Sequence, residues 1–133
     1  MQELEKEKNF VLLTQIYVEE GRVDDALAAL TQAEKTKQRS YYFEPTGLRL
    51  SVARLAEETR PAAAIEIYRA QAQQEIAGRQ RDSYASAARH LQQVKRLYAR
   101  LGENARWDAL IAQIRQENSR LRALKEELPK AGL

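Results

Sequence analysis

Hydrophobic residues recur every three or four positions along almost the whole chain, and this spacing predicts α-helices. The first apolar stripe consists of Phe10, Leu13, Ile16 and Tyr17, and it ends at Gly21, a residue type that commonly follows a helix. No segment alternates apolar and polar residues in the manner of a half-buried strand. The pattern therefore predicts an all-α protein without a β-sheet.

A second stripe starts directly after Gly21. It consists of Val23, Ala26, Leu27, Leu30 and Ala33. Asp24 and Asp25 fall in the first turn of this helix, where carboxylates suit the positive end of the helix dipole. The stripe fades in the basic stretch 35–39, and cations suit a helix C-terminus.

Residues 38–46 interrupt the helical pattern. Tyr41, Tyr42 and Phe43 precede Pro45, and a proline pushes the residue before it towards extended backbone. We expect a connector here, with aromatic side chains that pack onto neighbouring helices. Thr46 is the expected N-cap of the next helix.

Four more helices are expected in the rest of the chain. They run from Thr46 to about Glu58, Pro61 to Gly78, Arg81 to Leu101, and Asn104 to Leu128. The breaks at residues 21–22, 59–60 and 102–103 are short, and short breaks force neighbouring helices to run antiparallel. The prediction is six helices in three antiparallel pairs, with Tyr68 and Trp107 as core anchors.

The first predicted pair resembles a tetratricopeptide repeat. The resemblance rests on the spacing of Tyr17, Gly21, Ala26, Leu30 and Ala33. A shift of 38 residues places Leu55, Thr59, Ala64, Tyr68 and Ala72 in nearly the same roles, and the third pair aligns loosely. The resemblance implies a single tetratricopeptide-like domain over residues 1–133, with the helix pairs stacked as a right-handed superhelix.

A second resemblance covers residues 48–132, which look like the helical C-terminal region of bacterial SWIM zinc-finger proteins. The matching segments are Arg60–Tyr68, Tyr84–Leu91, Leu97–Gly102, Trp107 and Leu121–Leu128. Those proteins carry a Cys/His zinc motif elsewhere in the chain, and this sequence has no cysteine. Zinc is therefore not carried over, and the chain is expected to be a fragment of a longer protein or a stand-alone relative.

The amino-acid composition excludes several kinds of functional site. With no cysteine and one histidine, His90, the chain offers no disulfide, thiolate metal site or cysteine nucleophile. The acids nearest to His90 in sequence, Asp82 and Glu103, lie outside one helical turn. The glycines are scattered, so no phosphate-binding loop is apparent. We expect a non-enzyme without metal or cofactor, in the cytoplasm, because neither a signal peptide nor a membrane span is present.

Charge divides unevenly between the two halves of the chain. Residues 1–66 carry nine basic and twelve acidic side chains, whereas residues 67–133 carry thirteen and seven. A row of cations follows the last two predicted helices and forms a candidate basic face. Its members are Arg89, Lys95, Arg96, Arg100, Arg115 and Arg122. Nucleic-acid binding through phosphate contacts is the resulting alternative function, although no aromatic residue is interleaved for base stacking.

The leading functional expectation is a scaffold for protein–protein interaction. In tetratricopeptide modules the first helix of each pair lines a concave groove, so the resemblance implies a partner-binding groove built by polar residues off the buried stripe. The candidates are Lys8, Gln15, Glu19 and Arg49. The protein or peptide that would fill the groove is not specified by any motif.

Self-association is a third possibility. Leu121, Leu124 and Leu128 extend along the predicted last helix at heptad-like spacing, with Asn118 as a polar insert. This helix is longer than its predicted partner. We expect its overhang to pack either on the helix at 81–101 or on a second chain as a homodimer.

Overall fold

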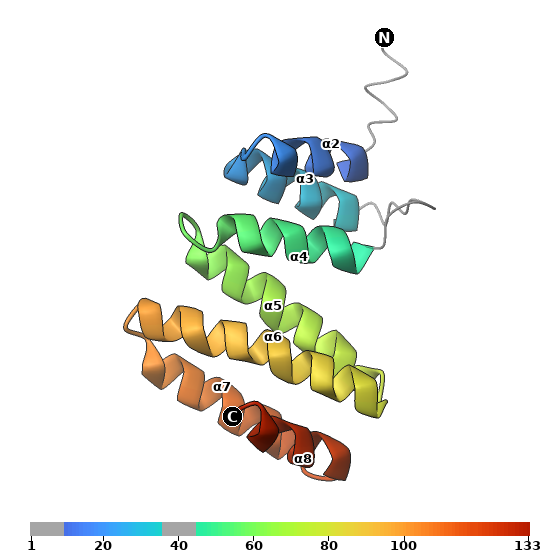
Figure 1. The fold of residues 1–133 in the computed structure, drawn as a ribbon, viewed down its shortest axis with the longest axis vertical. Coiled ribbons are helices and arrows are strands. Elements are labelled where there is room, and N and C mark those ends of the chain that lie inside the picture. The colour runs from blue at the N-terminus through green and yellow to red at the C-terminus, as the bar shows by residue number, and fades with distance from the viewer. Residues whose placement is uncertain (1–9, 36–44) are drawn as a thin grey trace. The chain divides into compact units, whose positions relative to one another are not determined.

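The computed structural model describes residues 10–35 and 45–133, and every regular element in these ranges is an α-helix (Figure 1). The prediction of an all-α protein is confirmed for this part of the chain. It holds seven helices: α2 (Phe10–Glu19), α3 (Val23–Lys35), α4 (Pro45–Ala56), α5 (Pro61–Ala77), α6 (Arg81–Arg100), α7 (Asn104–Glu117) and α8 (Arg122–Lys130).

The helices group into two compact units, Met1–Arg60 and Pro61–Leu133. The predicted pairs α2 with α3 and α6 with α7 each fall inside one unit, and both pairs are in contact. The predicted pair of α4 with α5 spans the boundary between the units. Stacking of three pairs in one domain therefore stays a prediction.

In the first unit, α2 and α3 pack side by side and α4 contacts both. Ala26 is fully buried near the start of α3, which lets the neighbouring backbone approach closely. Val11, Ala33 and Leu48 form a buried cluster contributed by all three helices. The core positions predicted for α3 are thus confirmed at Ala26, Leu30 and Ala33.

The buried side of α2 differs from the prediction. Val11 and Thr14 are buried, whereas Ile16, assigned to the buried stripe, is 39% exposed. Because seven of the ten residues of this helix are apolar, spacing alone did not define which side faces inwards. Thr14 is tolerated in the interior because its hydroxyl donates a 2.6 Å hydrogen bond to the carbonyl of Phe10.

The turn between α2 and α3 depends on Gly21, whose φ of 73° lies in the left-handed region. The next residue, Arg22, lies with its guanidinium carbon 4.7 Å from the centre of the Tyr17 ring. Arg22 also forms a 2.6 Å ion pair with Asp25. The attraction of Asp25 raises the pKa of Arg22 above its ordinary value.

The predicted connector 38–46 lies almost wholly outside the described residues, as do its aromatics Tyr41 to Phe43. Helix α4 begins at Pro45, so the prediction that Thr46 is its N-cap is wrong. A proline is well suited to a first helical turn because its missing N–H has no helical partner there. Thr46 therefore lies inside the first turn.

In the second unit, α5 packs against α6. The predicted core is confirmed on both helices, although Ile67 is only half-buried and Leu101 is 39% exposed. Small residues contribute to the interior of these helices, and Ala64, Ala72 and Ala87 are all fully buried. Tyr68 and Trp107, the predicted anchors, are also buried.

The predicted last helix, Asn104 to Leu128, is two helices. Helix α7 ends at Glu117, where the backbone N–H and side-chain amide of Asn118 both donate to the carbonyl of Ile114. The chain then turns, and α8 packs against α6. The break has a physical reason: the turn brings Leu124 and Leu128 into the interior, where each is 1% exposed.

Candidate functional site

Helix α2 presents an apolar stripe to solvent. Leu12 is 49% exposed and Ile16 is 39% exposed, on a helix whose opposite side is buried. Gln15 is half-buried and Glu19 is exposed. The spacing of these four residues places them on one side of the helix, since side chains three and four positions apart are neighbours. We refer to Leu12, Gln15, Ile16 and Glu19 as the α2 face.

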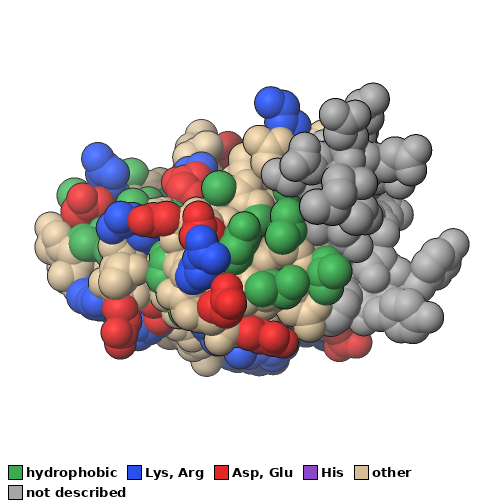
Figure 2. Space-filling view, turned by 90° about the horizontal axis from the view of Figure 1, so that it is seen from above, with side chains coloured by type: hydrophobic (Ala, Val, Ile, Leu, Met, Phe, Trp, Pro, Cys, Tyr) green, Lys and Arg blue, Asp and Glu red, His purple; other side chains and the backbone are tan. Residues whose placement is uncertain are grey.

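The α2 face contains two of the residues predicted to line a partner groove, Gln15 and Glu19. Figure 2 looks onto this end of the first unit and shows hydrophobic side chains gathered beside acidic ones. Leu12 and Ile16 were missed by the sequence reasoning, which assigned Ile16 to the core. Exposed apolar side chains that group together and are bordered by polar ones commonly mark an interaction surface.

Two other predicted groove residues do not extend this face. Lys8 lies outside the described residues. Arg49 is only 19% exposed, and its Nε donates a 2.7 Å hydrogen bond to Glu34, so it ties α4 to α3. This ion pair gives Arg49 a structural role, so its presence in the sequence does not require a bound partner.

The predicted basic face is partly used within the second unit. Lys95 donates to the carbonyl of Gly132 at 3.1 Å, and Arg115 donates to the carbonyl of Leu133. Gln92 donates to the carbonyl of Ala131 at 2.8 Å. These side chains from α6 and α7 therefore hold the last turn of the chain.

The other members of this face are solvent-exposed. Arg96 donates two hydrogen bonds to Gln93, its neighbour on α6. Arg89, Arg100 and Arg122 are exposed on α6 and α8. At least three of the six predicted cations, Lys95, Arg96 and Arg115, thus already donate to groups of this chain. This arrangement gives little support to a continuous phosphate-binding row.

A polar cluster that was not predicted links α5 to α6. Nδ1 of His90 lies 2.6 Å from Oε1 of Glu75, and the hydroxyl of Ser86 donates to Oε2 of Glu75 at 2.5 Å. The rings of Tyr68 and His90 stack with their centres 6.2 Å apart. The Glu75 and His90 side chains are only 15% and 14% exposed.

The cluster has the residue types of a serine hydrolase triad but a different order of hydrogen bonds. In such a triad the histidine accepts the proton of the serine, and the carboxylate orients the histidine. Here the hydroxyl of Ser86 donates to the carboxylate of Glu75 and not to His90, so the serine–histidine step of a triad is not formed. The geometry instead satisfies three polar groups at a helix–helix contact, where unpaired groups would be costly.

Sequence spacing did not reveal this cluster because its members lie on different helices. The short turn after α5 folds α6 back along it, so residues before the turn face residues after it. Glu75 lies fifteen positions before His90 and therefore escaped a search limited to one helical turn. The signal that would have found it is the short break between Gly78 and Arg81, because a short break also favours antiparallel packing of the two helices that it joins.

Comparison with known proteins gives no match to a family model, a curated protein or a solved structure. The tetratricopeptide and SWIM-protein resemblances therefore stay predictions. Within residues 10–35 and 45–133, no three histidine, aspartate or glutamate side chains gather in a way that could hold a metal ion. In the same ranges, no helix combines the length and hydropathy needed to cross a membrane.

Proposed function

We propose that this protein is a non-catalytic helical-repeat scaffold that binds a protein partner on the α2 face. The observation that carries the proposal is the exposure of Leu12 and Ile16 one turn apart, with Glu19 on the same side of the helix. Burying two such side chains in an interface is favourable because their apolar area leaves water.

The chemistry of the α2 face favours an amphipathic helix as the partner. An apolar stripe at helical spacing fits the ridge of a second helix, and helix-in-groove recognition uses anchors at this spacing. The carboxylate of Glu19 at one end of the stripe favours a basic residue at the matching end of the partner. The first 66 residues carry nine basic and twelve acidic side chains, and this net negative charge also favours a basic partner.

The tetratricopeptide-like superhelix is part of the same proposal. Gly21 in the tight turn and the buried Ala26, Leu30 and Ala33 support it, because the resemblance expects a turn glycine and buried residues at these positions. A relationship to the helical region of bacterial SWIM proteins is proposed on the quoted segments alone. Homodimerisation is the less favoured form of association, because Leu124 and Leu128 are already covered within the chain.

Affinity capture with matched surface variants tests the scaffold. The variant Leu12→Ser/Ile16→Ser removes the apolar stripe, and Leu101→Ser removes a comparably exposed leucine from the second unit. We expect a partner that is retained by the unmodified protein and by Leu101→Ser but is lost with the double variant. Its binding should then be reproduced with the purified partner. Retention of every captured protein by the double variant would reject the α2 face as the binding surface.

A further inference from the structure

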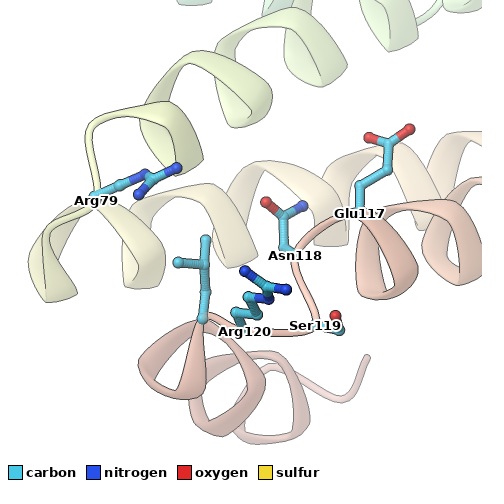
Figure 3. A pocket seen from close by; sticks show the side chains of 6 residues that line it. Arg79, Glu117, Asn118, Ser119 and Arg120 are labelled. Carbon is cyan, nitrogen blue, oxygen red and sulfur yellow. The ribbon is translucent and has the colours of Figure 1, made fainter.

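A polar pocket of about 400 Å³ lies between the loop that follows α5 and the loop that follows α7 (Figure 3). Arg79 enters it from the first loop, and Asn118, Ser119 and Arg120 come from the second. Leu121 is its apolar lining residue. The volume is within the range of small-molecule sites. All of these residues belong to the second unit, away from the α2 face in sequence.

Arg79 has an unusual backbone for its residue type. Its φ of 55° places it in the left-handed region, which glycine adopts readily and arginine rarely. Gly78 immediately precedes it without adopting a positive φ. A non-glycine residue held in this region costs on the order of 1–3 kcal/mol, and such residues concentrate at binding sites. The loop thus carries a strained arginine although a glycine is adjacent.

The pocket has uncompensated positive charge. Neither Arg79 nor Arg120 has an ion-pair or hydrogen-bond partner for its side chain among the described residues. Glu117 is the one acid of the lining, and its Oε1 accepts a 2.7 Å hydrogen bond from Gln113 on its own helix. In Figure 3 the carboxylate of Glu117 stands on the opposite side of the pocket from Arg79. The two guanidinium groups therefore remain available to an anion.

We propose that this pocket binds the phosphate group of a phosphate monoester. Two guanidinium groups from separate loops present forked N–H donors, which match phosphate oxygens in geometry and charge. The hydroxyl of Ser119 adds a neutral donor, while the side-chain amide nitrogen of Asn118 is already bonded to Ile114. The remaining volume and Leu121 accommodate the organic part of the ester.

Titration of the whole protein, followed by amide resonances in NMR spectra, tests the site. The probes are inorganic phosphate, adenosine monophosphate and an end-blocked phosphoserine, each compared with potassium chloride at equal ionic strength. We expect saturable shifts at residues 79 and 118–121 with all three phosphates. Tighter binding of adenosine monophosphate would identify a nucleotide as the source of the phosphate group. Tighter binding of phosphoserine would identify a phosphorylated side chain.

Three variants define the result. Asparagine tolerates the left-handed region, so Arg79→Asn removes the charge without added strain. Arg79→Asn and Arg120→Gln should each weaken phosphate-ester binding by at least about tenfold, the loss expected for a charge-assisted hydrogen bond. Arg89→Gln, an equally large charge change at an exposed site outside the pocket, should leave the affinity within about twofold. Shifts that salt reproduces, the absence of saturation, or an equal loss in Arg89→Gln would overturn the proposal.

Discussion

Glu75 and His90 meet across the contact between α5 and α6, with 2.6 Å between Oε1 and Nδ1. The second oxygen of the same carboxylate accepts from Ser86. One acidic side chain thus satisfies two donors on the neighbouring helix. The contact that joins the two helices therefore includes a polar cluster near the C-terminal end of α5.

Replacement of Glu75 by alanine should lower the free energy of unfolding by about 1–3 kcal/mol, because two half-buried donors lose their acceptor. Urea denaturation followed by circular dichroism measures the change. Glu66→Ala is the control, since Glu66 lies on the same helix in an exposed pair with Arg69. It should change stability by less than about 0.5 kcal/mol. Equal losses in the two variants would show that the cluster contributes nothing beyond helix charge.

Two glycines should respond to alanine with opposite signs. Gly21 has a φ of 73°, so Gly21→Ala should destabilise by about 1 kcal/mol through backbone strain. Gly47 lies inside α4 with no heavy atom within 4 Å of an added Cβ. Gly47→Ala should stabilise by about 0.5–1 kcal/mol, because alanine favours the helix. Thermal unfolding of both variants tests the pair, and a stabilising Gly21→Ala would contradict the turn described here.

The orientation of α2 can be tested with two truncations. Val11→Ala should cost about 1–3 kcal/mol because Val11 is 8% exposed in the interior. Ile16→Ala should cost less than about 1 kcal/mol, since Ile16 is 39% exposed. Chemical denaturation of the two variants measures both values. The reverse order would restore the apolar stripe that the sequence predicts and would remove the α2 face.

Replacement of Leu124 tests whether α8 is buried by its own chain or by a second chain. Leu124→Ala should cost about 2–5 kcal/mol, whereas Leu101→Ala at a 39% exposed site should cost less than about 1 kcal/mol. If α6 alone covers Leu124, the denaturation midpoint of the unmodified protein will not depend on protein concentration. A midpoint that rises with concentration would instead indicate that a second chain contributes to the folded state.

Helix positions and most core residues were predictable from sequence because amphipathic spacing is a local property. Tyr84, Leu91 and Val94 on α6 are examples, since polar residues separate them clearly from the solvent side. The rotation of α2 was not predictable, because apolar residues surround that helix on nearly all sides. The break after α7 was missed for a related reason, since helical spacing continues through Asn118 without a glycine or proline.

The candidate sites were less accessible to sequence reasoning. Gln15 and Glu19 were predicted through a resemblance, but their apolar neighbours Leu12 and Ile16 were not. The pairing of Glu75 with His90 and the pocket around Arg79 depend on which loops and helix faces meet in space. A single sequence does not specify these contacts, because each depends on the register between packed helices.

The packing pattern within each unit also has a kinetic consequence. The contacting helices are adjacent or next but one along the chain, as in α2 with α3, α5 with α6, and α6 with α8. Only short loops need to close before these contacts form, so the entropic barrier is small. Helical domains with such local connectivity fold on the microsecond to millisecond timescale. Each unit is therefore expected to assemble rapidly, and exposure of its interior to aggregation during folding is correspondingly brief.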